Sequence, residues 1–174
     1  MSGTIRLLVP TAENAPSAIA HHVRGLQAAG RSVLYLAADR PYRQVAAQFA
    51  QAGVDVSTLH FVDVVTCMDG KVPAVRPPNT LFLPSPTMLE MMAMRIEQVT
   101  ARLADPVVVV DSLNTLALYN GPSAVQEFSH YLANRLRARG VSGDFVLREG
   151  RDAASLRDQV ATFTDEQLVL GVFA

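Results

Sequence analysis

The chain has 174 residues, which suits one domain with its own hydrophobic core. Its 49% hydrophobic and 18% charged residues exclude a disordered chain, and a net charge of −1 argues against a nucleic-acid partner. A single cysteine, Cys67, excludes an internal disulfide, and no stretch reads as a signal peptide or membrane span, so we expect a cytoplasmic protein.

Short apolar runs alternate with helical patterns along the first half of the chain. The expected strands cover residues 5–9, 32–36 and 59–65. Helices are expected over residues 16–29 and 42–52, and each is followed by a glycine that favours a helix end. The polar, proline-bearing residues 69–80 are expected to form a surface loop.

The second half continues the same alternation. Helices are expected over residues 87–103 and 123–139, and strands over residues 107–110, 144–147 and 168–173. Strands that alternate with helices predict an α/β fold in which helices cover both faces of a mostly parallel sheet of about five to seven strands. With no linker or repeat in the chain, we expect a single domain over residues 1–174.

Residues 107–120 read VVVVDSLNTLALYN, an apolar strand that delivers Asp111 and Ser112. Either residue could cap the following helical turn through a side-chain oxygen. The run also resembles the Walker B strand of RecA-like proteins of the KaiC branch, including archaeal KaiC/GvpD-like domains. This resemblance implies a three-layer P-loop NTPase-like fold in which Asp111 would orient the hydration shell of Mg²⁺ beside nucleotide phosphates.

The turn after the first expected strand departs from that family. An active member carries G-x-x-x-x-G-K-[ST] here, so that backbone N–H groups and a lysine hold the phosphates. Residues 10–17 read PTAENAPS. Pro10 and Ala15 replace the glycines, Pro16 replaces the lysine, and only Ser17 keeps the family identity.

The altered turn predicts that ATP is not bound in the usual way and that the chain has no cofactor. The lysine charge and one N–H donor are lost together, and Glu13 adds a negative charge where phosphates would lie. Asn14 is expected to cap the following helix and Pro16 to occupy its first turn. The turn-to-helix junction is therefore expected to persist without its phosphate site.

A third resemblance lies in YLAADRPY at residues 35–42, where KaiC-like proteins end their second strand near a catalytic glutamate. Asp39 falls in this neighbourhood. An aspartate could activate a water there, but without bound phosphate it would have nothing to hydrolyse. The interpretation we prefer is that Asp39 and Pro41 set a turn and the start of a helix.

No catalytic residue and no metal site is predicted. His21 and His22 are adjacent and point about 100° apart on a helix, so they cannot readily bind one metal together. His60 and His130 have no partner at ligand spacing, so a lone buried or surface histidine is expected at each position. Ser85 lacks the G-x-S-x-G elbow that exposes a nucleophile.

Two side-chain groupings remain. A solvated face is expected for the basic residues Arg135, Arg137, Arg139, Arg148 and Arg151. A helical stripe that either packs in the core or offers an adaptable partner surface is formed by Met88, Met91 and Met92.

Three functions follow from these patterns. The first is a non-catalytic regulatory or scaffold protein that acts through protein–protein contacts or self-association. The second is a sensor of a small ligand in the former nucleotide crevice, built from Ser17, Asp39, Asp111 and Ser112. The third is an unconventional ATP-binding protein or ATPase.

Overall fold

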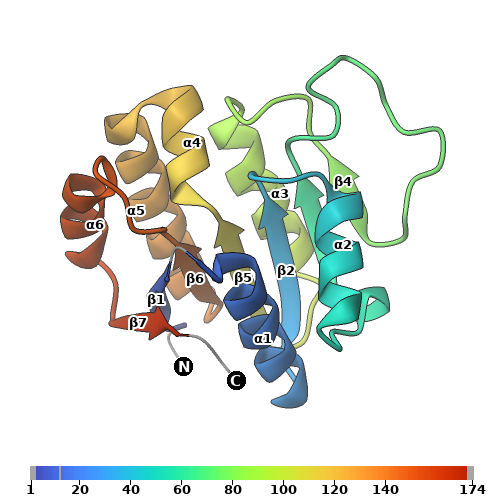
Figure 1. Cartoon of the computed structure of the whole chain (residues 1–174), viewed down its shortest axis with the longest axis horizontal. Coiled ribbons are helices and arrows are strands. Elements are labelled where there is room, and N and C mark those ends of the chain that lie inside the picture. The colour runs from blue at the N-terminus through green and yellow to red at the C-terminus, as the bar shows by residue number, and fades with distance from the viewer. Residues whose placement is uncertain (1–2, 12, 172–174) are drawn as a thin grey trace.

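A computed structural model, which describes residues 3–11 and 13–171, places seven strands in one parallel sheet (Figure 1). The strand order across the sheet is β4-β3-β2-β5-β6-β1-β7. The strands are β1 (Ile5–Pro10), β2 (Ser32–Ala37), β3 (His60–Asp63), β4 (Thr80–Phe82), β5 (Pro106–Asp111), β6 (Ser142–Val146) and β7 (Glu166–Leu170). Because all the pairs are parallel, the carboxyl ends of the strands share one edge of the sheet.

Helices cover both faces of this sheet, so the predicted three-layer α/β fold is confirmed. The helices α1 (Ala15–Ala28) and α2 (Tyr42–Gln51) lie in front of the sheet in Figure 1. The opposite face carries α3 (Leu89–Thr100), α4 (Leu113–Asn120), α5 (Pro122–Ala138) and α6 (Ala153–Ala161). Within the described residues, no helix is long and apolar enough to cross a membrane.

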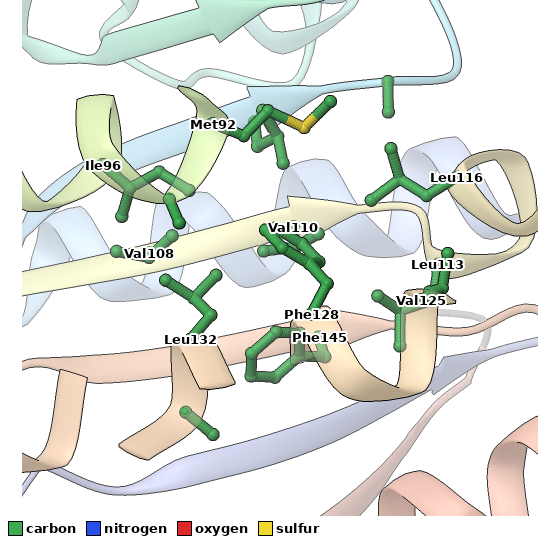
Figure 2. Close-up of a cluster of buried hydrophobic side chains, with 14 of the residues drawn as sticks. Met92, Ile96, Val108, Val110, Leu113, Leu116, Val125, Phe128, Leu132 and Phe145 are labelled. Carbon is green, nitrogen blue, oxygen red and sulfur yellow. The ribbon is translucent and has the colours of Figure 1, made fainter. Parts of the chain in front are cut away.

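The central strands are apolar on both sides because each face is covered by helices. In β5, Val109 faces the layer of α1 and α2, whereas Val110 faces the layer of α3 to α6. Figure 2 shows Val110 between Met92 of α3 and Phe128 of α5. Met92 is fully buried, which confirms core packing for this member of the methionine stripe.

An ionic cluster ties β1, β6 and α1 together inside the sheet–helix interface. The fully buried Asp144 accepts two hydrogen bonds from Arg6, at 2.7 Å from Nε and 3.0 Å from Nη2. The Nε2 atom of His22 lies 2.6 Å from the second Asp144 oxygen. His22 is therefore held by a carboxylate of β6, a partner that sequence periodicity does not reveal.

Several shorter elements were not predicted. The strand β4 has only three residues, α4 forms where only a helical turn is expected after Ser112, and the sequence of α6 has no clear periodicity. The last strand begins and ends earlier than expected, and residues 172 and 173 of that prediction lie outside the described residues. Residues 69–79 contain no strand or helix, as the composition predicted.

Candidate functional site

Three charged residues meet at the carboxyl edge of the sheet because β2, β5 and β6 are neighbours there. Asp39 follows β2, Asp111 ends β5, and Arg148 follows β6. Asp39 and Arg148 are separated by 109 positions in the sequence, yet their side chains are in direct contact. The parallel order of the strands therefore assembles a site from distant segments.

Arg148 lies between the two carboxylates and pairs with both. Its Nη1 donates to Oδ2 of Asp39, and its Nη2 lies 3.2 Å from Oδ1 of Asp111. The remaining oxygens also have partners: Ser112 Oγ donates to Asp39 at 2.8 Å, and the Tyr35 hydroxyl donates to Asp111. We call Asp39, Asp111, Ser112, Tyr35 and Arg148 the arginine-bridged site.

The backbone around Arg148 is fixed by Asn114 at the start of α4. The Arg148 N–H donates to Asn114 Oδ1 at 2.8 Å, and Asn114 Nδ2 donates back to the Arg148 carbonyl at 3.0 Å. Ser112 caps the same helix by accepting from the Thr115 N–H at 3.4 Å, as its sequence position suggested. Arg148 is thus held at its backbone by hydrogen bonds to Asn114 and at its guanidinium by the two carboxylates.

Burial shapes the protonation chemistry of the site. Asp111 is 2% exposed, and its burial raises the pKa of the carboxyl to about 6, although the Tyr35 hydrogen bond and the Arg40 charge oppose the rise. Burial also lowers the pKa of the Arg148 guanidinium and, with the nearby Asp111 charge, raises the pKa of Tyr35 well above its usual value. Strongly shifted pKa values of this kind gather at functional sites.

A cavity of about 380 Å³ opens beside the arginine-bridged site, between α1 and the ends of β2 and β6. Its walls are Ala15, Pro16, Asp39, Arg40, Thr115 and Arg148. Among the described residues, three buried side-chain atoms lack a hydrogen-bond partner: Thr11 Oγ1, Arg40 Nε and Arg148 Nε. Two of these atoms belong to arginines of the cavity wall.

The structure brings together three of the four residues predicted for the former nucleotide crevice. Asp39, Asp111 and Ser112 are members of the arginine-bridged site. Ser17 is exposed on the first turn of α1 and is not part of the cavity wall.

The preferred interpretation, in which Asp39 helps to start the helix α2, is wrong about the helix start. The carboxylate at the start of α2 is that of Asp63, which accepts from the Tyr42 N–H at 2.7 Å, whereas Asp39 is held by Arg148 and Ser112. Pro41 immediately precedes the helix, as predicted.

The strand and the helix that flank the predicted turn, β1 and α1, are both present at the expected places. The strand ends at Pro10, α1 begins at Ala15, and Pro16 lies in its first turn. Asn14 occupies the cap position, but its side chain makes no capping hydrogen bond, so that part of the prediction is wrong. Ala12 lies outside the described residues.

Arg148 is the residue that sequence reasoning misassigned, because it was grouped with the basic residues of α5 as part of a solvated face. Its side chain is only 27% exposed and points into the site. The available signal was positional: Arg148 closely follows a strand at the same edge as Asp39 and Asp111. The arginines in the last turn of α5 and just after it do form surface ion pairs, with Glu97 and with Asp165.

The carboxylates that could hold a cation are Asp39 and Asp111, and both are paired with Arg148. No group of three or more histidine, cysteine, aspartate or glutamate residues gathers into a metal-binding cluster in the part of the chain that the structure describes.

The model of a family of unknown function, DUF7504, matches residues 4–167. A KaiC-like protein from the hyperthermophilic archaeon Pyrococcus horikoshii OT3 is similar in structure, with a TM-score of 0.71 and 15% sequence identity over 99% of this chain and 73% of its own length. At that identity the likeness shows a shared RecA-like, KaiC-like fold. No curated protein matches the chain.

Proposed function

The chain belongs to the family of unknown function DUF7504, and on that premise we propose that it is a non-catalytic RecA/KaiC-like protein that acts as a regulatory or scaffold module through protein–protein contacts. The observation that supports this proposal most strongly is the pairing of Arg148 with both Asp39 and Asp111. An NTPase on this fold needs carboxylates that are available to Mg²⁺ and water. Here a side chain of the protein itself occupies them.

Binding of Mg²⁺ at these carboxylates would require the displacement of Arg148. The guanidinium is 27% exposed, and burial lowers its pKa, so a displaced arginine would lose its counter-ions in a poorly solvated place. Breaking a buried pair by removing one partner costs about 3–5 kcal/mol, and partial exposure reduces this figure. The cation would therefore compete against an established ion pair.

The turn between β1 and α1 supports the same proposal. It lacks both glycines and the lysine of a phosphate-binding loop. A charge-assisted hydrogen bond to phosphate contributes about 1.5–3 kcal/mol, which this turn cannot supply through a lysine. The loss of phosphate contacts and the pairing of the carboxylates act in the same direction.

Isothermal titration with Mg·ATP and with Mg·ADP tests the proposal. We expect no saturable binding heat for either nucleotide and no phosphate release above the buffer rate. Micromolar binding that disappears in Asp111→Asn, with an unchanged circular dichroism spectrum, would overturn the claim of inactivity and support the unconventional ATPase instead.

A second candidate function, a sensor of a small ligand, is favoured by the cavity beside the arginine-bridged site. Its wall carries the side chains of two arginines, Arg40 and Arg148, and a cavity wall with two cationic groups favours an anionic ligand. Thermal shift in the presence of inorganic phosphate and of carboxylic acids tests this function. A rise in melting temperature that is lost in Arg40→Gln supports it, whereas no shift with either class counts against it.

A further inference from the structure

A groove on the outer surface of the helical layer lies between α3 and α5. Its volume is about 880 Å³, and its floor includes the buried side chains of Ala93 and Phe128. Midway along the groove, Met94 is 44% exposed and Tyr131 is 54% exposed. Met94 and Tyr131 thus present exposed apolar surface between charged residues at the two ends of the groove.

Charge is distributed unequally along this groove. Both helices run toward the amino edge of the sheet, since each leads into a strand, β5 or β6. At the starting end the groove carries Glu90 and Glu127, and neither forms a salt bridge among the described residues. At the other end Arg135 and Arg139 share the single carboxylate of Glu97. The groove therefore has an acidic end and a basic end.

The spacing of these charges on α5 is symmetric about Tyr131. Glu127 precedes Tyr131 by four residues and Arg135 follows it by four, so all three share one helix face, with each charge about 6 Å along the axis from the tyrosine. A second copy turned end for end would bring Tyr131 against its equivalent. Each Glu127 would then lie opposite the Arg135 of the other copy.

We propose that the chain forms a two-fold homodimer in which the α3–α5 groove docks, antiparallel, on the same groove of a second copy. The occupant is a second copy because the charge pattern complements its own reverse, which is the requirement for an isologous interface. A uniformly acidic or uniformly basic partner would meet repulsion at one of the two ends. This inference rests on the proposed function, because it names the protein contact through which a non-catalytic module would act.

Sedimentation velocity over a range of protein concentrations, at low and at high salt, tests the dimer. The wild-type chain should dimerise as its concentration rises, and high salt should weaken the association because the end contacts are exposed ion pairs. Glu127→Arg and Arg135→Glu should each weaken it by about tenfold, since each replaces two attractive contacts with two repulsive ones. Asn134→Arg, an exposed change on α5 outside the groove, should leave it unchanged.

Mixing the two weakened variants provides the decisive measurement. A Glu127→Arg chain and an Arg135→Glu chain offer opposite charges at both ends, so they should form a heterodimer although each alone is largely monomeric. A general folding defect would not be rescued in this way. A wild-type chain that stays monomeric at all concentrations, or a mixture that shows no heterodimer, would overturn the proposal.

The outcomes separate this inference from the proposed function. A monomeric chain that binds no nucleotide would remove the dimer and leave the non-catalytic assignment in place. Nucleotide binding by a chain whose dimer responds to the charge changes as expected would remove the non-catalytic assignment and leave the groove as an interface.

Discussion

Arg148 Nη2 lies 3.2 Å from Oδ1 of Asp111 and so links the ends of the neighbouring strands β6 and β5. The same guanidinium pairs with Asp39 beyond β2. In an NTPase of this fold, the positive charge at such an edge comes largely from a bound metal ion. In this chain a fixed side chain supplies positive charge there, which makes the electrostatic balance of the edge independent of a ligand.

Replacing Arg148 with alanine should destabilise the fold. The change leaves Asp39 and Asp111, whose side chains are 8% and 2% exposed, without their shared counter-ion. We expect the free energy of unfolding in urea to fall by about 2–4 kcal/mol, with the partial exposure of Arg148 favouring the lower figure. Arg151→Ala, at an exposed position on the same segment, is the matched control. Equal effects of the two changes would contradict an essential bridge.

The Asp111→Asn variant should alter how stability depends on pH. The pKa of about 6 in the folded state lies above the ordinary aspartate value of 3.8, so the folded state holds the proton more tightly and the Asp111 contribution to stability decreases as pH rises from about 4 to 6. The difference in unfolding free energy between wild type and variant should fall by up to about 1.4 kcal/mol per pH unit in this window. Urea unfolding at a series of pH values measures it.

Other groups do not mimic this pH effect. Burial lowers the pKa of His60, which gives the opposite slope and is common to both proteins. The pKa values of Glu97 and Asp165 are lowered, mainly by hydrogen bonds from Arg135 and from the Ile5 N–H, so their contributions are lost as pH falls, which is the opposite slope and is common to both proteins. Parallel pH curves for wild type and Asp111→Asn would show that Asp111 does not titrate near pH 6.

The Tyr35→Phe variant should raise the pKa of Asp111 further. The phenol donates to the buried carboxylate, and this hydrogen bond lowers the pKa against the effect of burial. We expect a loss of about 1–2 kcal/mol in the free energy of unfolding at neutral pH. A double-mutant cycle with Asp111→Asn isolates the interaction, and strictly additive effects would argue that the two side chains are not coupled.

The Asp144→Asn variant tests the ionic cluster under α1. The change leaves Arg6 and His22 beside each other without a carboxylate, so we expect a loss of about 2–4 kcal/mol in the free energy of unfolding. Asp158→Asn on α6, at an exposed position, should change it by less than about 0.5 kcal/mol. A similarly small decrease in the free energy of unfolding of both variants would show that the cluster contributes little to stability.

The central part of the fold was predictable because its strands are buried on both faces. The run of valines before Asp111 can only be a covered strand, and the helices that end before Gly30 and Gly53 have clear boundary signals. The strand β4 and the helix α6 are short, so their periodicity is too brief to separate from a loop. Their positions depend on packing against the rest of the sheet.

The candidate site was only half predictable. Asp39, Asp111 and Ser112 could be placed at one edge from strand order and family resemblance. Arg148 could not, since an arginine after a strand is usually solvated and its partners lie far away in the sequence. Asp144 was equally hard to predict, because it is a buried carboxylate in a strand and its partners, Arg6 and His22, come from other elements that are distant in the sequence.

The arginine-bridged site also has a kinetic consequence. Its ion pairs join segments 109 and 37 positions apart, so they can form only after β2, β5 and β6 have aligned. Contacts that are completed after the transition state slow unfolding while leaving the folding rate almost unchanged. Arg148 is therefore expected to slow unfolding and to prolong the lifetime of the folded chain, with little effect on the folding rate.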